Sequence, residues 1–303
     1  MQTAEKPLFR FAHISDLHFY NLSWNPSQFF SKRWLGNLNL SLVRKHTFYP
    51  EGLTSLIPVF QEKRIDAVLI TGDLTSTSHE KEFQLAKQFI DQLQSEKFKV
   101  FTLPGNHDHY TKNAYKNKLF YKYFDTHYTS SSDPVSSLSL KDDGIAASPM
   151  GHGWWLFALD TALATSLLSS NGYFSSELQQ KLETALNDLP QDHNVILLNH
   201  FPLFANESPR KSLIRREALQ NILERFPKIK LFLHGHTHRH CIADLRASHL
   251  PLILDSGSTA QKNGATWNLI DIYPQGCEVE VFTNNRQNGH VSWKPLSKST
   301  FKW

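Results

Sequence analysis

Short apolar runs that end in polar residues recur along the chain. Five of them are short enough to be buried β-strands, and an Asp, Asn or His follows each one closely. They occupy residues 8–14, 67–71, 100–103, 195–198 and 231–233. Because ligands of open α/β sheets collect at the carboxyl ends of strands, we expect these five strand ends to converge.

Segments with helical periodicity lie between these runs. Apolar residues recur at three- and four-residue spacing over 83–93, 178–189 and 219–226. Ser176 and Gln179 have the spacing of a capping box, which predicts the start of the second helix. Strands that alternate with helices in this way predict an α/β fold.

Three later apolar stretches have strand character without helices between them. They cover residues 252–255, 266–273 and 278–282. With the earlier strands they predict two packed sheets with helices outside. A chain of 303 residues, 40% hydrophobic and 20% charged, fits one large globular unit. We therefore expect residues 1–303 to form a single catalytic domain.

Charge and cysteine content exclude several classes of function. The net charge of +4 is mild and no long basic groove is evident, so a nucleic-acid partner is not expected. Cys241 and Cys277 are too few for a disulfide framework or a thiolate metal site. No apolar stretch approaches the roughly 20 residues of a membrane span, and no signal-peptide core is present at the start. We therefore expect a cytoplasmic protein, and nothing indicates its oligomeric state.

Carboxylate, amide and imidazole side chains follow the predicted strands directly. The motifs are Asp16-Leu17-His18, Gly72-Asp73, Gly105-Asn106-His107-Asp108, Asn199-His200 and Gly235-His236-Thr237-His238. Side chains two residues apart in an extended segment point to the same side. Imidazole and carboxylate suit Mn, Fe and Zn. Each motif alone is more often an ordinary strand end or turn, but all five together predict a metal site.

The five motifs, in this order, resemble the signature of the calcineurin-like metallophosphoesterases. The resemblance extends from residue 16 to residue 238. It implies a four-layer α-β-β-α sandwich of two mixed sheets flanked by helices, with two bound metal ions, Mn and/or Fe or alternatively Zn. One ion would be bound by Asp16, His18, Asp73 and His238, and the other by Asp73, Asn106, His200 and His236. Asp73 would bridge the two ions.

The same resemblance implies hydrolysis of phosphate esters. His107 would face the substrate, either as general acid to the leaving oxygen or as a charge stabiliser. Many relatives orient this histidine with an acid three residues after the bridging Asp, but Ser76 occupies that position here. Asp108 or a backbone carbonyl would then have to orient His107.

Residues 19–50 form a basic and aromatic insertion after the first motif. No acidic residue lies between Asp16 and Glu51. The candidate substrate contacts are Lys32, Arg33, Trp34 and, beside the third motif, His109. Basic residues interleaved with aromatic ones over 24–45 are also typical of peripheral membrane contact. The alternative is that the rings cap the core and the charges are solvated.

Several functions are compatible with these motifs. The short GHTH ending and the early insertion are most similar to bacterial cyclic-nucleotide-phosphodiesterase-like proteins, which favours a phosphodiesterase. UDP-diacylglucosamine pyrophosphatases of lipid A synthesis share the metal motifs, and acyl chains would give the apolar part of the insertion a role. Nucleases of the superfamily are a third alternative, and a catalytically silent metal-binding scaffold is one from another class. The expected partner is a phosphorylated small molecule or a lipid-linked substrate.

Overall fold

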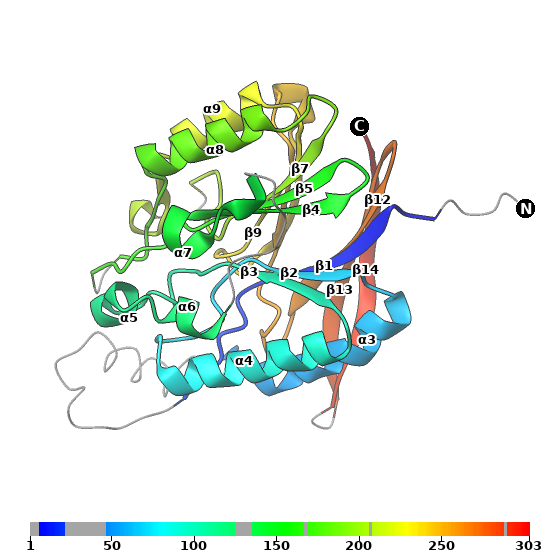
Figure 1. The fold of residues 1–303 in the computed structure, drawn as a ribbon. Coiled ribbons are helices and arrows are strands. Elements are labelled where there is room, and N and C mark those ends of the chain that lie inside the picture. Colours follow the sequence, from blue (N-terminus) through cyan, green and yellow to red (C-terminus); the bar gives the residue numbers. More distant parts are fainter. Residues whose placement is uncertain (1–5, 22–46, 125–134, 167–168, 206–207, 288–289) are drawn as a thin grey trace, which may run out of the picture.

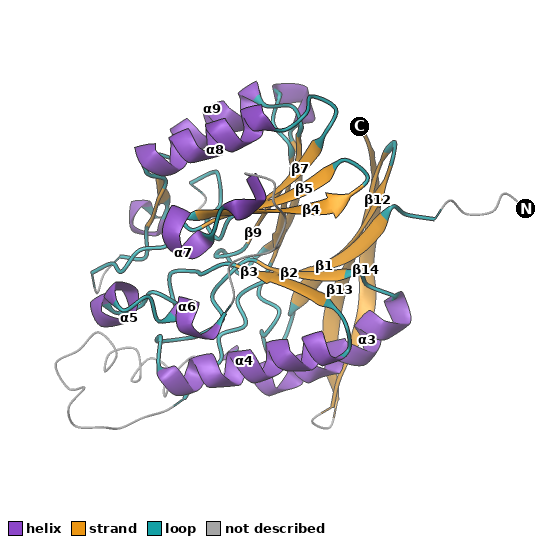
Figure 2. Ribbon diagram, in the orientation of Figure 1, coloured by secondary structure: helices purple, strands orange, loops and turns teal. Residues whose placement is uncertain are grey.

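Two six-stranded sheets pack face to face, and helices cover the outer face of each (Figure 1). The computed structural model describes residues 6–21, 47–124, 135–166, 169–205, 208–287 and 290–303. Helices, strands and connecting loops alternate as an α/β fold requires (Figure 2). The protein is thus a four-layer α-β-β-α sandwich of two mixed sheets, which confirms the predicted fold class.

The first sheet has the strand order β14-β13-β12-β1-β2-β3. Its strands are β1 (Phe9–Ile14), β2 (Ala67–Ile70), β3 (Lys99–Thr102), β12 (Thr266–Tyr273), β13 (Gly276–Gln287) and β14 (His290–Lys302). β1, β2 and β3 are parallel, so their carboxyl ends share one edge, whereas β12, β13 and β14 continue the sheet in antiparallel pairs. Helices α3 (Leu56–Lys63) and α4 (Glu80–Ser95) lie on its outer face (Figure 1).

The second sheet has the strand order β10-β11-β9-β7-β5-β4. Its strands are β4 (Ile145–Gly151), β5 (Trp154–Leu159), β7 (Asn194–Leu198), β9 (Ile229–His234), β10 (His240–Asp244) and β11 (Leu252–Ser256). The central strands β5, β7, β9 and β11 are parallel. Helices α8 (Ser176–Asp188) and α9 (Arg216–Arg225) cover its outer face (Figure 1).

Shorter elements connect these layers. β6 (Gly172–Tyr173) and β8 (Leu213–Ile214) form a separate two-stranded sheet. The short helical segments are η3 (Pro50–Ser55), α5 (Lys112–Lys116), α6 (Phe120–Tyr123), η4 (Val135–Ser137), α7 (Leu140–Asp143), η5 (Pro209–Lys211) and η6 (Arg246–Ser248). α5, α6 and α7 lie together beyond the ends of the parallel strands (Figure 1).

The central strands are buried on both faces, which explains why their sequences read as continuous apolar runs. In β1, Phe11 packs in the layer between the sheets, whereas Ala12 and Ile14 pack under the helices α3 and α4. Leu233 of β9 meets the inter-sheet layer from the other side. A third apolar layer, which includes Leu182, joins α8 and α9 to the second sheet.

The five predicted strands and three predicted helices are all present, the latter as α4, α8 and α9. The capping box predicted from Ser176 and Gln179 is wrong. Ser175 is the N-cap of α8, and its Oγ accepts a hydrogen bond from the N–H of Leu178 at 3.0 Å. Ser175 has an extended backbone while Ser176 is already helical, so the hydroxyl one residue earlier reaches the unpaired N–H groups of the first turn.

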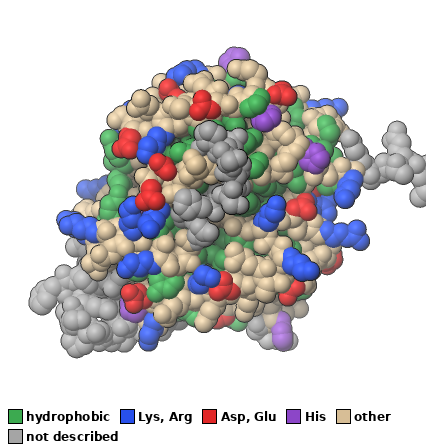
Figure 3. Space-filling model, in the orientation of Figure 1, with side chains coloured by type: hydrophobic (Ala, Val, Ile, Leu, Met, Phe, Trp, Pro, Cys, Tyr) green, Lys and Arg blue, Asp and Glu red, His purple; other side chains and the backbone are tan. Residues whose placement is uncertain are grey.

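Some predictions fall outside the described residues or stay predictions. The insertion at 19–50 lies mostly within the undescribed stretch 22–46, which contains Lys32, Arg33 and Trp34. Among the helices that the structure describes, none has the length and apolar character needed to cross a bilayer. On the face drawn in Figure 3, basic and acidic side chains are interspersed. The single domain over 1–303 stays a prediction.

Candidate metal centre

The candidate ligands come from both sheets and meet where the parallel strands end. Asp16 and His18 follow β1, Asp73 follows β2, Asn106 follows β3, His200 follows β7, and His236 and His238 follow β9. The first three strands belong to one sheet and the last two to the other. The predicted convergence of five strand ends is therefore observed, and the centre lies at the junction of the sheets.

The first group of donors is compact. One atom each from Asp16, His18, Asp73 and His238 lies within 4.8 Å of all the others. The Nε2 atoms of His18 and His238 are 3.0 Å apart, and Oδ1 of Asp16 lies 3.1 Å from Nε2 of His238. Ligands bound at about 2.1 Å around one ion lie about 3 to 3.5 Å from one another. These four residues therefore fit a single cation.

The second group has the same dimensions. Oδ1 of Asn106 lies 2.9 Å from Nδ1 of His236 and 3.2 Å from Nε2 of His200. The two imidazole nitrogens are 3.3 Å apart, and Oδ2 of Asp73 lies 3.5 Å from Nε2 of His200. Asp73 thus belongs to the first group and also reaches the second.

Backbone carbonyls orient two of the histidines. Nδ1 of His200 lies 2.7 Å from the carbonyl oxygen of Thr71, and Nε2 of His236 lies 3.0 Å from that of Lys211. A carbonyl can only accept, so these nitrogens carry the protons. The opposite nitrogen of each ring, the one that faces Asn106, is then the basic one, as a metal ligand must be.

The ligand loops depend on an unusual backbone. Five of the seven candidate ligands have a left-handed φ, namely Asp16, His18, Asp73, His236 and His238, with values from 48° to 72°. Such strain is uncommon outside glycine and clusters at functional sites. It indicates that the surrounding structure holds these residues for a purpose other than stability.

Two glycines of the motifs, Gly105 and Gly235, are required because other parts of the chain lie very close to their backbones. A Cβ on Gly105 would lie 2.5 Å from the backbone nitrogen of Asp73, and one on Gly235 would lie 2.6 Å from Oδ2 of Asp16. No side chain fits at either place without moving a carboxylate of the centre. Gly105 therefore allows the β2 and β3 loops of the first sheet to touch, and Gly235 allows the β9 loop of the second sheet to touch the β1 loop of the first.

Neighbouring histidines keep the buried carboxylates ionised. Burial alone would raise the pKa of Asp16, but His238 lowers it below its usual value. His200 and His107 lower the pKa of Asp73 well below the usual range in the same way, against the effect of burial. Burial would lower the pKa of His200, but Asp73 raises it to about 9. Two buried carboxylates that stay charged need cationic partners, which suits metal binding.

His107 is oriented by the backbone. Its Nδ1 lies 2.7 Å from the carbonyl oxygen of Ser76, and its ring centroid lies 5.0 Å from that of His18. The carboxylate of Asp108 instead accepts hydrogen bonds from the N–H groups of Leu74, Thr75 and Gly105. The Ser76 carbonyl, and not Asp108, therefore orients His107. Asp108 instead holds the loops after β2 and β3 together.

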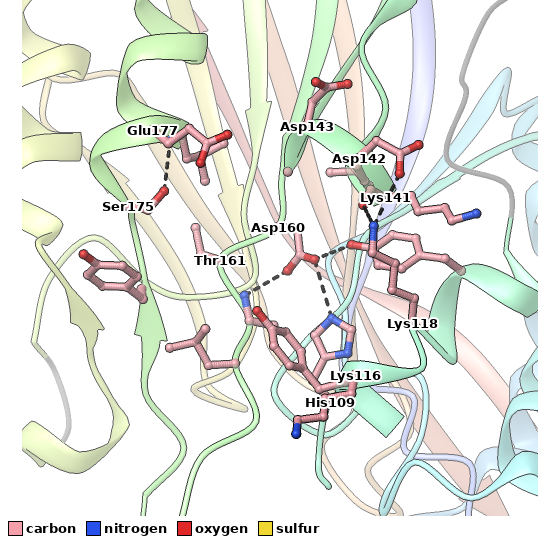
Figure 4. Close-up of a pocket in the computed structure, with 18 residues that line it drawn as sticks. His109, Lys116, Lys118, Lys141, Asp142, Asp143, Asp160, Thr161, Ser175 and Glu177 are labelled. Carbon is pink, nitrogen blue, oxygen red and sulfur yellow. Dashed lines mark hydrogen bonds and ion pairs between the residues drawn. The ribbon is translucent and has the colours of Figure 1, made fainter. Parts of the chain in front are cut away.

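His109 lies apart from the two donor groups. It lines a cavity of about 430 Å³, and its Nε2 is 3.5 Å from a carboxylate oxygen of Asp160 (Figure 4). Tyr121 donates its hydroxyl proton to the same carboxylate. No candidate metal ligand lines this cavity among the described residues. The role of His109 in substrate binding stays a prediction.

Comparison with known proteins decides the family. The model of the calcineurin-like phosphoesterase family matches residues 9–240. The chain belongs to this family. The family to which the sequence motifs pointed is therefore confirmed.

The relatives of this family member include bacterial phosphodiesterases. It is 26% identical over 194 residues to the 3',5'-cyclic adenosine monophosphate phosphodiesterase CpdA of Escherichia coli, covering 62% of this chain and 60% of CpdA. It is 25% identical over 177 residues to a 3',5'-cyclic-nucleotide phosphodiesterase of Nostoc, covering 58% of this chain and 56% of that protein. The chain thus spans 56–60% of the length of these relatives. The resemblance to the bacterial cyclic-nucleotide branch is borne out.

Solved structures share the fold. A dimetal phosphatase from Danio rerio superimposes with a TM-score of 0.65 at 13% identity, covering 98% of this chain and 99% of that one. The purple acid phosphatase PPD1 of yellow lupin gives a TM-score of 0.61 at 13% identity, covering 98% of this chain and 54% of that one. At these identities the likeness shows the fold alone.

This family member has contacts at its candidate centre that the motifs did not indicate. The carbonyls of Thr71, Ser76 and Lys211 leave no trace in the sequence, because every residue has one. Phe48 is different: its ring centroid lies 4.5 Å from that of His18 and 5.5 Å from that of His238. It belongs to the basic and aromatic segment, so that segment ends against the centre.

Proposed function

We propose that this protein is a phosphodiesterase with a dinuclear metal centre. The observation that carries the proposal is the presence of two compact donor groups that share Asp73. The first ion would be held by Asp16, His18, Asp73 and His238, and the second by Asp73, Asn106, His200 and His236. Mn and/or Fe suit these oxygen and nitrogen donors, and Zn is the alternative.

Two cations held here would supply positive charge for the phosphate oxygens and acidify a water. The chain's own contribution is positioning. His107, held through Nδ1 by the Ser76 carbonyl, would present Nε2 to the leaving oxygen and donate a proton there. Phosphoryl transfer relies on such charge stabilisation, so no nucleophilic side chain is required.

Preference for diesters is supported by the relatives. Those reported above are named as cyclic-nucleotide phosphodiesterases, and a further one, from Enterobacter lignolyticus, is named as a glycerophosphodiester phosphodiesterase. A phosphorylated small molecule is therefore the proposed substrate, and a cytoplasmic location is proposed with it.

Substitution of the shared and second-group ligands tests the proposal. Asp73→Ala and His236→Ala should abolish Mn²⁺-dependent hydrolysis of an aryl phosphodiester while circular dichroism stays near wild type. Lys294→Ala, an exposed position on the edge strand β14, is the control and should keep full activity. Turnover by metal-stripped Asp73→Ala would refute the scheme. A wild-type protein that binds metal without any turnover would support the scaffold function instead.

A second candidate function is a pyrophosphatase acting on a lipid-linked nucleotide. It is favoured by Phe48, which brings the end of the basic and aromatic segment against His18. Comparison of a phosphomonoester, cyclic AMP and a UDP-linked lipid in one assay separates the candidates, because only the second function requires the lipid.

Peripheral membrane contact through 24–45 belongs to the same proposal. If this stretch is interfacial, the combined substitutions Lys32→Ala, Arg33→Ala and Trp34→Ala should weaken flotation with anionic liposomes. Equal flotation of the variant and the wild type would count against both the membrane contact and the lipid-linked substrate.

A further inference from the structure

The loop after β9 carries two candidate ligands in a strained conformation. His236 and His238 have φ angles of 72° and 56°. A left-handed backbone costs a non-glycine residue roughly 1 to 2 kcal/mol, so two such residues in one short loop require compensating contacts. Thr237, which lies between them, makes those contacts.

The Thr237 hydroxyl lies at the middle of the loop's hydrogen bonds. Its Oγ1 donates to Oδ2 of Asp255 at 2.6 Å and accepts from the N–H of Arg239 at 3.1 Å. The N–H of Thr237 donates to the carbonyl of Gly235 at 2.9 Å. The hydroxyl thus connects both halves of the loop to a carboxylate that is distant in sequence.

Asp255 is a rigid attachment point. It is buried in β11, between β9 and β10, where it pairs in register with His234 on one side and Cys241 on the other. Its Oδ1 accepts a hydrogen bond from the N–H of Gly257 at 2.8 Å, which fixes the carboxylate while Oδ2 faces Thr237. The carboxylate therefore cannot follow the loop if the loop moves.

A second contact holds the same loop from the opposite sheet. The N–H of His236 donates to Oδ2 of Asp16 at 3.0 Å. One attachment point leaves the loop free to pivot, whereas two on either side fix its orientation. Of these two contacts, the one to Asp255 comes from a residue that is not a ligand of the proposed centre.

We propose that Thr237 and Asp255 form a clamp that positions His236 and His238 for both metal ions. Neither residue of the clamp would touch an ion. The inference rests on the proposed dinuclear centre and assigns positioning residues to it. Removal of groups that orient metal ligands costs about 10- to 100-fold in metal affinity, and a loss of that size is expected here.

The test measures Mn²⁺ binding to metal-free protein by calorimetry, with the electron paramagnetic resonance spectrum of bound Mn²⁺ as a second readout. Thr237→Val keeps the side-chain shape but loses the hydroxyl, and it should weaken Mn²⁺ binding about 10- to 100-fold and change the spectrum. Thr237→Ser restores the donor and should bind within about threefold of wild type. Asp255→Ala should weaken Mn²⁺ binding at least as much as Thr237→Val, because it also removes the hydrogen bond from Gly257. The double variant should lose little more than Asp255→Ala alone, because the interaction between the two side chains is already lost in either single variant.

Thr266→Val is the matched control. Its hydroxyl also makes a buried hydrogen bond, at 2.6 Å to the carbonyl of Ser256, but lies outside the clamp. It should lower thermal stability as much as Thr237→Val does and leave Mn²⁺ affinity unchanged.

Three results would overturn the inference. They are wild-type Mn²⁺ affinity in Thr237→Val, a failure of Thr237→Ser to restore binding, and an equal loss of affinity in Thr266→Val. Absence of binding of Mn²⁺, Fe²⁺ and Zn²⁺ to the wild type would overturn the proposed function as well, so the two failures are distinguishable.

Discussion

Gly105→Ala tests whether the close contact between the β2 and β3 loops is what forms the centre. The new Cβ would lie 2.5 Å from the backbone nitrogen of Asp73 and 2.8 Å from its Cγ. Carbon and nitrogen atoms prefer a separation of about 3.5 Å, so the loops must move apart by about 1 Å. A displacement of this size at a reactive centre costs about 100-fold in rate. We therefore expect kcat/KM for an aryl phosphodiester to fall at least about 100-fold, or about 2.7 kcal/mol.

Gly151→Ala is the control, because it strains the backbone without displacing the loops of the candidate centre. Gly151, the last residue of β4, has a φ of +97°, and a Cβ there would meet no atom within 4 Å. Gly151→Ala should therefore lose about 1 to 2 kcal/mol of stability through its backbone and keep wild-type kcat/KM. Steady-state kinetics with saturating Mn²⁺ and thermal unfolding of each variant give both quantities. A folded Gly105→Ala protein with kcat/KM within about twofold of wild type would refute the reasoning.

Three further outcomes follow from the structure. Lys228→Met should cost about 2 kcal/mol in urea unfolding, because the Lys228 ammonium donates to three backbone carbonyls at the carboxyl end of α8 at 3.0 to 3.2 Å. Trp267→Ala should cost about 3 to 5 kcal/mol in the same assay, since this buried ring stacks on Phe282 with centroids 4.5 Å apart. Chelation by EDTA should lower the thermal midpoint, and free Mn²⁺ at 100 times its Kd should add about 2.7 kcal/mol, because Asp16 and Asp73 are buried charges that a cation would neutralise. An unchanged midpoint in either condition would contradict the last expectation.

The sequence predicted most of the strands that are buried on both faces, but β5 was missed although every one of its residues is buried. β1, β2, β3, β7 and β9 are continuous apolar runs because each packs between a sheet and a helical layer. β14 was not predicted. It is an edge strand that is exposed over most of its length and contains Pro295 beside a bulge, so neither an apolar run nor a regular alternation marks it.

The candidate site was predictable to the extent that side chains define it. The seven candidate ligands meet as expected because each follows a strand whose direction is fixed by the sheet. The groups that orient His200 and His236 were not predictable, since the carbonyls of Thr71 and Lys211 contribute backbone atoms. For His107, a backbone carbonyl was one of the two expected partners, but the sequence did not indicate that it belongs to Ser76. Asp255 contributes its side chain, which accepts a hydrogen bond from Thr237, a residue 18 positions away. The two residues meet because β9 pairs with β11, and this pairing cannot be read from the sequence.

The centre also depends on the packing of the two sheets. Asp16, Asp73 and Asn106 come from the first sheet, while His200 and His236 come from the second. Hydrogen bonds cross the junction within the centre itself, from His236 N–H to Asp16 and from His200 Nδ1 to a carbonyl after β2. A relative shift of the sheets would therefore break both donor groups at once. The inter-sheet apolar layer thus sets the geometry of the centre, whereas the layers under α4 and α8 contribute to stability without fixing the distances between ligands.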